Sequence, residues 1–459
     1  MTTTGFGGGV RARLDRAALL ALCERGVQAA RDAGAQEAEV YAESSAEVEV
    51  SLQKNDLDQV RVADEVQFGV RVFVDGRLGF ATANDPGAVV TTARDAVAVA
   101  QASPPDPDAG LPPAVPVMDQ PDAVDEALLQ LEPGALARMA VDLLAWTRGR
   151  DPRITIDTGA VAVAHTVRAV ASSTGVRAAW GSAAGSGHMF GMAVDGDTVG
   201  SFAYDGDAVR QLAQLRPKLE AAFGRFVAGA TGALGATAGE SFRGPIVLPP
   251  EAVESVLVGP LMRNLGGDAV RQGRSALAGR IGERIAAPGF TLVEGGAGIA
   301  GYPLCPFDRE GQPRATLPLV EDGVLKAFLY DGREARAAGV RSTGHAQGGA
   351  TALPSVGPAA LVLATGDVPR ATLERMERGV IVTRFSGSTD PVSGDFSGVV
   401  KGGFLVKDGE RRPIHETTIA GNLWTCLKNV SARADTAHLH YGSRAWPALR
   451  VEDVSITAG

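Results

Sequence analysis

Two short histidine-containing sequences in this chain have spacings that could bind a metal ion. His438 and His440 lie two residues apart, so on a strand both side chains would point to the same side and could bind one metal ion. The same spacing is more common on an exposed strand face that binds no ligand. His415-Glu416 begins like the zinc-binding sequence His-Glu-x-x-His, but Ile419 occupies the position of the second histidine. The sequence completes no zinc motif here and leaves His438 and His440 as a weak alternative metal site.

A glycine-rich segment has the spacing of a dinucleotide-binding loop. Gly296, Gly298 and Gly301 follow a predicted strand in the pattern G-x-G-x-x-G. Such a loop must lead into a helix whose N-terminus faces the phosphates. Tyr302 and Pro303 come next instead, and this sequence blocks the helix. We therefore predict a turn and not a cofactor site.

Composition and charge indicate a folded protein without a nucleic-acid surface. The chain has 459 residues, of which 45% are hydrophobic, and a formal net charge of −9. Lysines and arginines form no cluster of the kind that binds nucleic acid. The three cysteines form no C-x-x-C pair, which fits a reducing compartment. Since neither a signal peptide nor an apolar run of about 18 residues is present, we expect a cytoplasmic protein without a membrane segment.

Hydrophobic periodicity predicts an α+β N-terminal domain over residues 1–230. The Asp75-Gly76 step predicts a hairpin turn within an alternating run. A Pro-rich loop is expected at 103–122. Because helices and strands do not alternate strictly, a doubly wound parallel sheet is not expected. The periodic segments are helices beginning at Asp15 and over 86–101, 132–148 and 207–227, and strands over 37–53, 66–83, 153–171, 174–184 and 188–204.

The sequence pattern over the remaining residues, 231–459, predicts a mainly antiparallel β domain. A Gly-, Ala- and Thr-rich stretch at 228–244 marks the boundary. A helix is expected over 250–265, because Val253, Leu257 and Leu261 share one of its sides. Beyond about residue 285 nearly every signal is a short strand followed by a turn such as Asp322-Gly323.

Several segments resemble the TldD/PmbA family. The sequence GRSALAGRIGERIAAPGFTLVEGG, which follows a helix beginning EAVE, is similar to the central region of that family. Further similar segments are EDGVLKAFLYDGREARAAGVRSTGHA, DPVSGDFSGVVKGGFLVKDGE and ETTIAGNL, and the N-terminal alternating strands. These segments are spread over most of the chain.

The metal positions of the family are the point at which this chain departs from the pattern. The catalytic branch has His-Glu-x-x-x-His on a helix, and the two histidines bind zinc. Here Pro250 and Ser255 stand at the two histidine positions, and only Glu251 is kept. The region matching the C-terminal cysteine ligand contains no cysteine, and Cys426 lies just ahead of it. The resemblance is therefore to the metal-free, TldE-like branch.

This resemblance implies a subunit that cannot hydrolyse peptides alone. The family pairs such a chain with a TldD-like, zinc-binding subunit, and the two enclose a chamber for unfolded peptides or peptide-like compounds. No cofactor is implied in this chain, and zinc is expected in the partner. Candidate residues for the substrate or partner groove are Glu251, Arg274, Arg280, Glu283 and Arg284.

Three alternatives stay open from the sequence. The arginines of the 273–284 segment could simply pair with local carboxylates. The fold could host a different enzyme, one that hydrolyses or transfers amides on a small peptide-like metabolite and uses His438 and His440. The chain could also bind peptides without any cleavage taking place.

Overall fold

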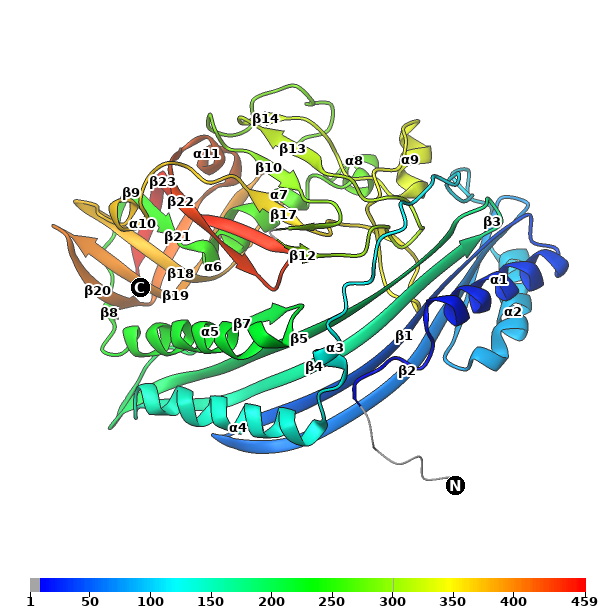
Figure 1. Cartoon of the computed structure of the whole chain (residues 1–459). Coiled ribbons are helices and arrows are strands. Elements are labelled where there is room, and N and C mark those ends of the chain that lie inside the picture. Colours follow the sequence, from blue (N-terminus) through cyan, green and yellow to red (C-terminus); the bar gives the residue numbers. More distant parts are fainter. Residues whose placement is uncertain (1–8, 300) are drawn as a thin grey trace.

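The computed structural model describes residues 9–299 and 301–459, which form two large sheets with helices packed around them (Figure 1). The N-terminal sheet has seven strands in the order β3-β2-β1-β4-β5-β6, and β7 pairs with β5. Neighbouring strands in it run antiparallel. Their bounds are Glu37–Gln53 (β1), Asp56–Val74 (β2), Arg77–Ala83 (β3), Ile154–Ser172 (β4), Arg177–Asp195 (β5), Thr198–Val199 (β6) and Ala203–Val209 (β7).

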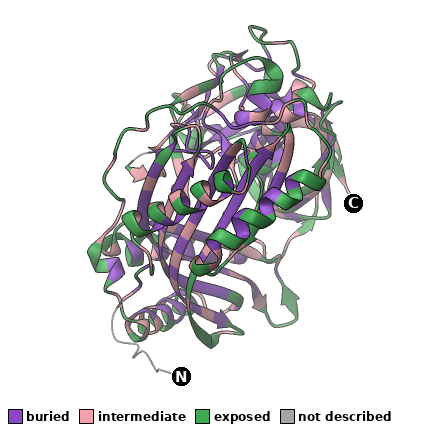
Figure 2. Cartoon of the chain, turned by 90° about the vertical axis from the view of Figure 1, so that its right-hand side faces the viewer, coloured by how far each residue is buried: buried purple, intermediate pink, exposed green. Residues whose placement is uncertain are grey.

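Helices cover one face of this sheet, two at each end. Along β1, Val40 and Ala42 pack under α1 and α2, whereas Val48 and Val50 pack under α4 and α5. These residues all have even numbers, so they share one face of the strand. Figure 2 shows the strands largely buried and the outward sides of the helices exposed. The helices are Arg16–Asp32 (α1), Val89–Ala102 (α2), Glu126–Leu129 (α3), Pro133–Arg150 (α4) and Leu212–Gly232 (α5).

Most N-terminal predictions are confirmed by these elements. The strand predicted over 37–53 has those bounds, and the Asp75-Gly76 turn forms with φ values of 48° and 71°. Residues 103–122 contain no helix or strand, as expected for the Pro-rich loop. Strand β2 begins ten residues before the predicted start at 66, because its first half pairs with β1 while its side chains stay exposed.

The prediction of separate strands at 174–184 and 188–204 is wrong. One strand, β5, runs continuously through the glycines between them. Gly185 and Gly187 lie directly beneath Leu215 and Leu219 of α5, where a Cβ atom would come within 3.0 Å of the leucine side chains. The glycines therefore let a helix approach the sheet closely and do not break the strand.

The C-terminal sheet has twelve strands and is mainly antiparallel, so the predicted fold class is confirmed. Ten strands follow the order β14-β13-β10-β17-β23-β9-β18-β19-β20-β8, and β21 and β22 join this path through β19 and β23. The pairs β17–β23, β9–β18 and β8–β20 are parallel. The longest strands are Phe242–Leu248 (β9), Arg378–Thr389 (β18), Asp395–Lys407 (β19), Glu410–His415 (β20), Thr417–Asn422 (β21), Val430–His440 (β22) and Arg444–Ala458 (β23).

Short strands and helices complete this domain. The short strands are Thr237–Ala238 (β8), Leu292–Glu294 (β10), Gly298–Ile299 (β11), Tyr302–Pro303 (β12), Leu317–Glu321 (β13), Val324–Leu325 (β14), Ala346–Gln347 (β15), Ser355–Val356 (β16) and Leu361–Leu363 (β17). The helices are Pro250–Val253 (α6), Gly259–Met262 (α7), Gly267–Arg271 (α8), Gly332–Ala338 (α9), Arg370–Leu373 (α10) and Leu423–Lys428 (α11). The last three were not expected in a region predicted to contain little but strands and turns. Within the described part of the chain, no helix has the length and apolar character needed to span a bilayer.

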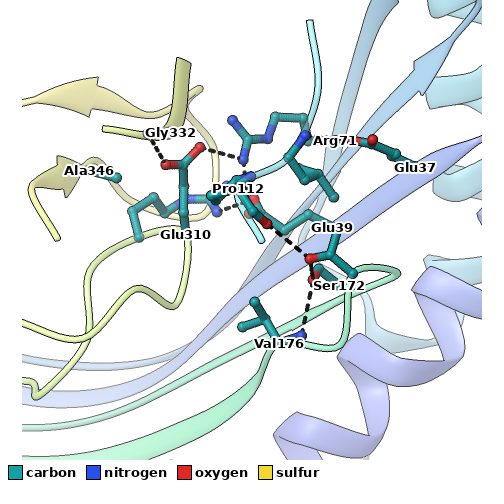
Figure 3. A network of polar contacts seen from close by, with 12 residues as sticks. Glu37, Glu39, Arg71, Pro112, Ser172, Val176, Glu310, Gly332 and Ala346 are labelled. Carbon is teal, nitrogen blue, oxygen red and sulfur yellow. Dashed lines mark hydrogen bonds and ion pairs between the residues drawn. The ribbon is translucent and has the colours of Figure 1, made fainter. Parts of the chain in front are cut away.

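A buried ion network joins the two domains. Arg71 of β2 donates to Glu39 of β1 at 2.9 Å and to Glu310 of the C-terminal domain at 2.7 Å. Arg309 donates to the other oxygen of Glu39 at 2.9 Å. Glu310 in turn accepts from the backbone N–H of Gly332 (Figure 3). Since these four side chains are at most 6% exposed, each charge depends on the others for compensation.

Candidate functional site

A cavity of about 540 Å³ lies between the two domains. The N-terminal domain contributes β7 and α5 to its wall. The C-terminal domain contributes the turn before α6 and parts of β18, β19 and β22. Its principal lining residues are Phe202, Tyr204, Asp205, Arg225, Glu251, Glu254, Arg384, Phe404, His440, Tyr441 and Trp446.

Aromatic side chains give this cavity open apolar surface. Phe202 is 42% exposed and Tyr204 is 62% exposed, and both line the cavity. The Phe202 ring packs against Phe190 with a centroid separation of 5.0 Å. The guanidinium of Arg384 lies 3.9 Å from the Phe202 ring. Such a surface can bind apolar side chains of a ligand and hold them beside a cation.

The helix predicted over 250–265 forms one wall of the cavity. It consists of α6, a π-helical turn at Glu254–Val258, and α7. The N–H of Gly259 bonds to the carbonyl of Glu254, five residues back, and this wide turn precedes Pro260, which has no N–H to donate. Ala252 and Val253 point into the core, whereas Glu251 and Glu254 are exposed and line the cavity.

The two positions that correspond to zinc-binding histidines do not fit a metal. Pro250 is buried and has no ligand atom in its side chain. The Ser255 hydroxyl donates back to the carbonyl of Ala252 at 3.1 Å. Across residues 9–299 and 301–459, no three His, Cys, Asp or Glu side chains come together as a metal site. We therefore assign no metal-dependent step to this wall.

An ion pair fixes the opposite wall. Arg225 of α5 donates from two nitrogens to the two carboxylate oxygens of Asp205, at 2.9 and 2.8 Å. Burial raises the pKa of the Asp205 carboxyl above its ordinary value, Arg225 opposes this rise, and the negative charge of Glu251 adds to it. Asp205 and Glu251 both line the cavity, so acidic groups of both domains face it.

His438 and His440 lie on one face of β22, as their spacing predicts. Their ring centroids are 4.3 Å apart, and both Nε2 atoms are buried with no hydrogen-bond partner among the described residues. Burial lowers the pKa of His438 to about 3, with a further lowering by His440, and burial lowers the pKa of His440 to about 4. Both rings are neutral at physiological pH and could therefore coordinate a metal, but no third ligand stands beside them in the part of the chain that the structure describes.

The other four candidate residues lie away from the cavity and form local contacts. Arg280 pairs with Glu283 at 2.8 Å. Arg274 pairs with Asp268 at 3.5 Å. The structure thus brings Glu251 to the cavity and separates it from this segment.

Arg284 makes the same kind of local contact. It donates to the backbone carbonyl of Asp322 at 2.6 Å and lies 3.4 Å from its carboxylate. All four residues of the 273–284 segment therefore form local ion pairs, as in the alternative that its arginines simply pair with nearby carboxylates.

Several cavity residues were not identified from the sequence. Phe202, Tyr204, Arg384 and Tyr441 come from strands and turns that are distant in the chain, and no periodicity brings them together. Tyr441 has a φ of 45°, an uncommon backbone conformation for a bulky residue. Its neighbour Gly442 was the one local signal that this turn is unusual.

Comparison with known families matches two regions of the chain. Residues 38–100 match the family described as PmbA/TldA metallopeptidase domain 1. Residues 241–458 match the PmbA/TldA metallopeptidase C-terminal domain. The cavity lies largely between the second region and the β7–α5 segment that precedes it.

Individual relatives agree with these matches. Metalloprotease PmbA of Escherichia coli O157:H7 is 26% identical over 429 residues, which cover 90% of this chain and 92% of that protein. Protein MJ0231 of Methanocaldococcus jannaschii is 31% identical over 192 residues, and the match spans 41% of this chain and 45% of that protein. TldD homologues from Haemophilus influenzae and Buchnera aphidicola are also among the relatives.

A solved structure shares the fold over nearly the whole chain. The crystal structure of TldE from Thermococcus kodakarensis superposes with a TM-score of 0.85 at 23% identity, covering 95% of this chain and 99% of that one. The two-sheet fold is therefore common to both proteins.

Proposed function

This chain belongs to the PmbA/TldD metallopeptidase family, and we propose that within it the chain is the zinc-free subunit of a two-subunit peptidase. In this role it forms part of a chamber and binds unfolded peptide or a peptide-like compound. A TldD-like, zinc-binding subunit hydrolyses the bound substrate. The complex works in the cytoplasm, and this chain carries no cofactor of its own.

One observation carries the proposal. Glu251 faces a cavity between the domains, while the residues at the two histidine positions, Pro250 and Ser255, offer no imidazole to a metal. The absence of imidazole at these two positions supports a role for this chain as a subunit without a metal of its own. Relatives of this chain include TldD homologues as well as PmbA homologues, which supports a pairing between the two kinds of subunit.

The cavity has the character of a peptide-binding surface. Open aromatic rings at Phe202 and Tyr204 suit apolar side chains, and Glu251 and Arg384 suit charged ones. An extended peptide could also pair its backbone with strand edges beside the cavity, which gives affinity without sequence specificity. This role needs neither a nucleophile nor a metal from this chain.

The test is metal content and peptidase activity, measured on the purified chain alone and after mixing with a TldD-like subunit from the same genome. We expect no bound zinc and no cleavage from the chain alone, and cleavage in the mixture above that of the partner alone. Stoichiometric zinc or clear peptidase activity in the isolated chain would contradict the proposal. Peptide binding without cleavage in the mixture would favour a pure binding protein.

A second candidate function is an amide-cleaving or amide-transferring enzyme acting on a small peptide-like metabolite. The observation in its favour is the neutral pair His438 and His440, whose Nε2 atoms have no partner in the described structure. This function predicts activity without any partner subunit, and predicts that His440→Gln abolishes it.

A further inference from the structure

A second cavity, of about 410 Å³, lies where the N-terminal sheet meets residues 304–314 and 346–359 of the C-terminal domain. Its walls combine aromatic rings with an unusual number of arginines. The aromatic residues are Tyr41, Trp180 and Phe307, and the arginines are Arg168, Arg210, Arg309 and Arg314. Arginine clusters of this kind bind carboxylate or phosphate groups.

Arg309 presents a buried donor to this cavity. Its side chain is 1% exposed, and one terminal nitrogen, Nη1, is held by Glu39 at 2.9 Å. The other, Nη2, is buried and has no hydrogen-bond partner in the described part of the chain. The guanidinium lies 4.2 Å from the Tyr41 ring, which fixes its orientation. A buried donor without a partner indicates a place for a ligand oxygen.

Two more arginines lack a carboxylate partner among the described residues. Arg210 donates to backbone carbonyls only, to Pro303 at 3.1 and 3.3 Å and to Ala183 at 3.0 Å. The Nε atom of Arg314 is buried and makes no hydrogen bond there. Arg168, in contrast, is paired with Glu43 at 2.9 Å. In the described structure, buried nitrogens without a partner therefore belong to Arg309 and Arg314, whereas Arg210 lacks only a carboxylate partner.

The charged groups around the cavity leave a positive surplus, of one charge when Asp308 is ionised and of two when it is protonated. Burial and the nearby Glu310 raise the pKa of Asp308 to about 7, whereas hydrogen bonds from the backbone N–H groups of Gln312 and Ala346 oppose this rise. A surplus of positive charge suits an anionic ligand group such as a carboxylate. The groups counted are Arg71, Arg168, Arg210, Arg309 and Arg314 against Glu39, Glu43, Asp308 and Glu310.

Contacts connect this cavity to the first one. The guanidinium of Arg210 lies 4.4 Å from the ring of Tyr302. Gly442 packs so closely on the same ring that a Cβ atom there would come within 2.4 Å of it. The preceding residue, Tyr441, lines the first cavity. The Tyr302 ring therefore lies between a residue that lines the second cavity and the turn that lines the first.

We propose that the second cavity binds the C-terminal carboxylate of a peptide, with Arg210, Arg309 and Arg314 donating to its oxygens. The side chain of the last residue packs on the Trp180 and Phe307 wall. This assignment rests on the proposed function, because it takes peptides as the ligand class. It adds a preference for free peptide ends over internal segments.

The experiment is calorimetric titration of the full chain with acetyl-Ala-Ala-Phe, as the free acid and as its C-terminal amide. We expect the acid to bind and the amide to bind at least about tenfold more weakly, because the charge-assisted hydrogen bonds are lost. Arg314→Gln should weaken binding of the acid by about tenfold and leave the amide unchanged. Arg314→Lys should restore part of the loss, and exposed Arg263→Gln is the matched control with no effect.

Other outcomes would overturn the assignment. The assignment is wrong if acid and amide bind equally. It is also wrong if the Arg314→Gln variant unfolds at the wild-type temperature and binds the acid normally. If inorganic phosphate binds more tightly than the acid, and Arg314→Gln abolishes that binding, the ligand of this cavity is a phosphate group and not a peptide carboxylate. If the mixture with a TldD-like subunit cleaves peptides while acid and amide bind equally, the proposed function stands and this cavity assignment fails.

Discussion

Arg71 and Arg61 lie on the same strand and both pair with a glutamate of β1, yet their surroundings differ. Arg71 is 6% exposed and holds Glu39 and Glu310 together, whereas Arg61 is 54% exposed and pairs with Glu47 at 3.1 Å. We expect Arg71→Ala to lower the free energy of unfolding by about 3–5 kcal/mol, because it leaves buried carboxylates uncompensated. Arg61→Ala should cost less than about 1 kcal/mol.

Urea denaturation of the two variants at neutral pH tests this difference. Equal losses for Arg71→Ala and Arg61→Ala would show that the buried network does not hold the domains together.

The neutral histidine pair predicts a dependence of stability on pH. His438 and His440 have pKa values lowered to about 3 and about 4 in the folded chain, below the ordinary value of 6.5. As the pH falls below 6.5, the unfolded chain binds protons that the folded chain does not. This stability is therefore present above pH 6.5 and is lost as the pH falls to about 4 for His440 and to about 3 for His438. The slope is at most about 1.4 kcal/mol per pH unit for each histidine, and less for side chains that keep some contact with solvent.

Replacing both histidines by glutamine should flatten this profile. Unfolding free energies of wild type and the His438→Gln/His440→Gln variant, measured between pH 7 and pH 4, check it. Parallel profiles for the two proteins would mean that the rings take up protons in the folded state.

Glycines decide how closely elements pack in the N-terminal sheet. At Gly191 of β5 a Cβ atom would lie 2.1 Å from the carbonyl oxygen of Thr155, a backbone atom of the neighbouring strand that cannot move alone. Gly191→Ala should therefore destabilise the chain by about 1–3 kcal/mol. Gly149→Ala is the matched control, since Gly149 lies in α4 with open space around it. There we expect no loss, and a gain of up to about 1 kcal/mol from higher helix propensity.

Thermal unfolding of the two alanine variants distinguishes these effects by sign. A stable Gly191→Ala protein would indicate that β4 and β5 can separate at this point.

The same glycines show where sequence reasoning about elements succeeds and where it fails. Period-two alternation predicted β1 with its correct bounds, because a strand with one buried face carries that signal in every second residue. The predicted strands at 174–184 and 188–204 leave out Gly185–Gly187, because the sequence does not distinguish a glycine that makes room for a helix from a glycine in a turn. Helix α9 was missed because seven residues carry too few apolar positions to show a period.

The candidate site depends on contacts that no local pattern records. Glu251 could be named from its motif, but Tyr204 and Arg384 reach the cavity only because two separately folded sheets meet there. The buried network also joins the two domains, and its members Arg71 and Glu310 are 239 residues apart in the chain. Local periodicity carries no information at that separation.

At the scale of the molecule, the open aromatic rings of the first cavity predict an effect on substrate binding without an effect on folding. Phe202→Ala/Tyr204→Ala should raise the KM for peptide hydrolysis by the mixture with a TldD-like subunit by about tenfold, because two apolar contacts are lost. The kcat should stay within about twofold, because the metal and its chemistry belong to the partner in the proposed function.

Val340→Ala, at an exposed apolar side chain outside the cavity, is the control for a general loss of apolar surface. A drop in kcat at unchanged KM would place Phe202 and Tyr204 in the assembly of the complex and not in substrate binding.

The four-membered network of Glu39, Arg71, Arg309 and Glu310 also constrains how this protein can change over generations. Each charge neutralises neighbours from another strand or the other domain. A substitution that removes one of the four residues therefore leaves buried charge without compensation among the other three. Single substitutions at these four positions are therefore expected to be strongly destabilising. We expect descendants of a common ancestor either to keep the whole quartet or to have replaced it as a unit with apolar residues.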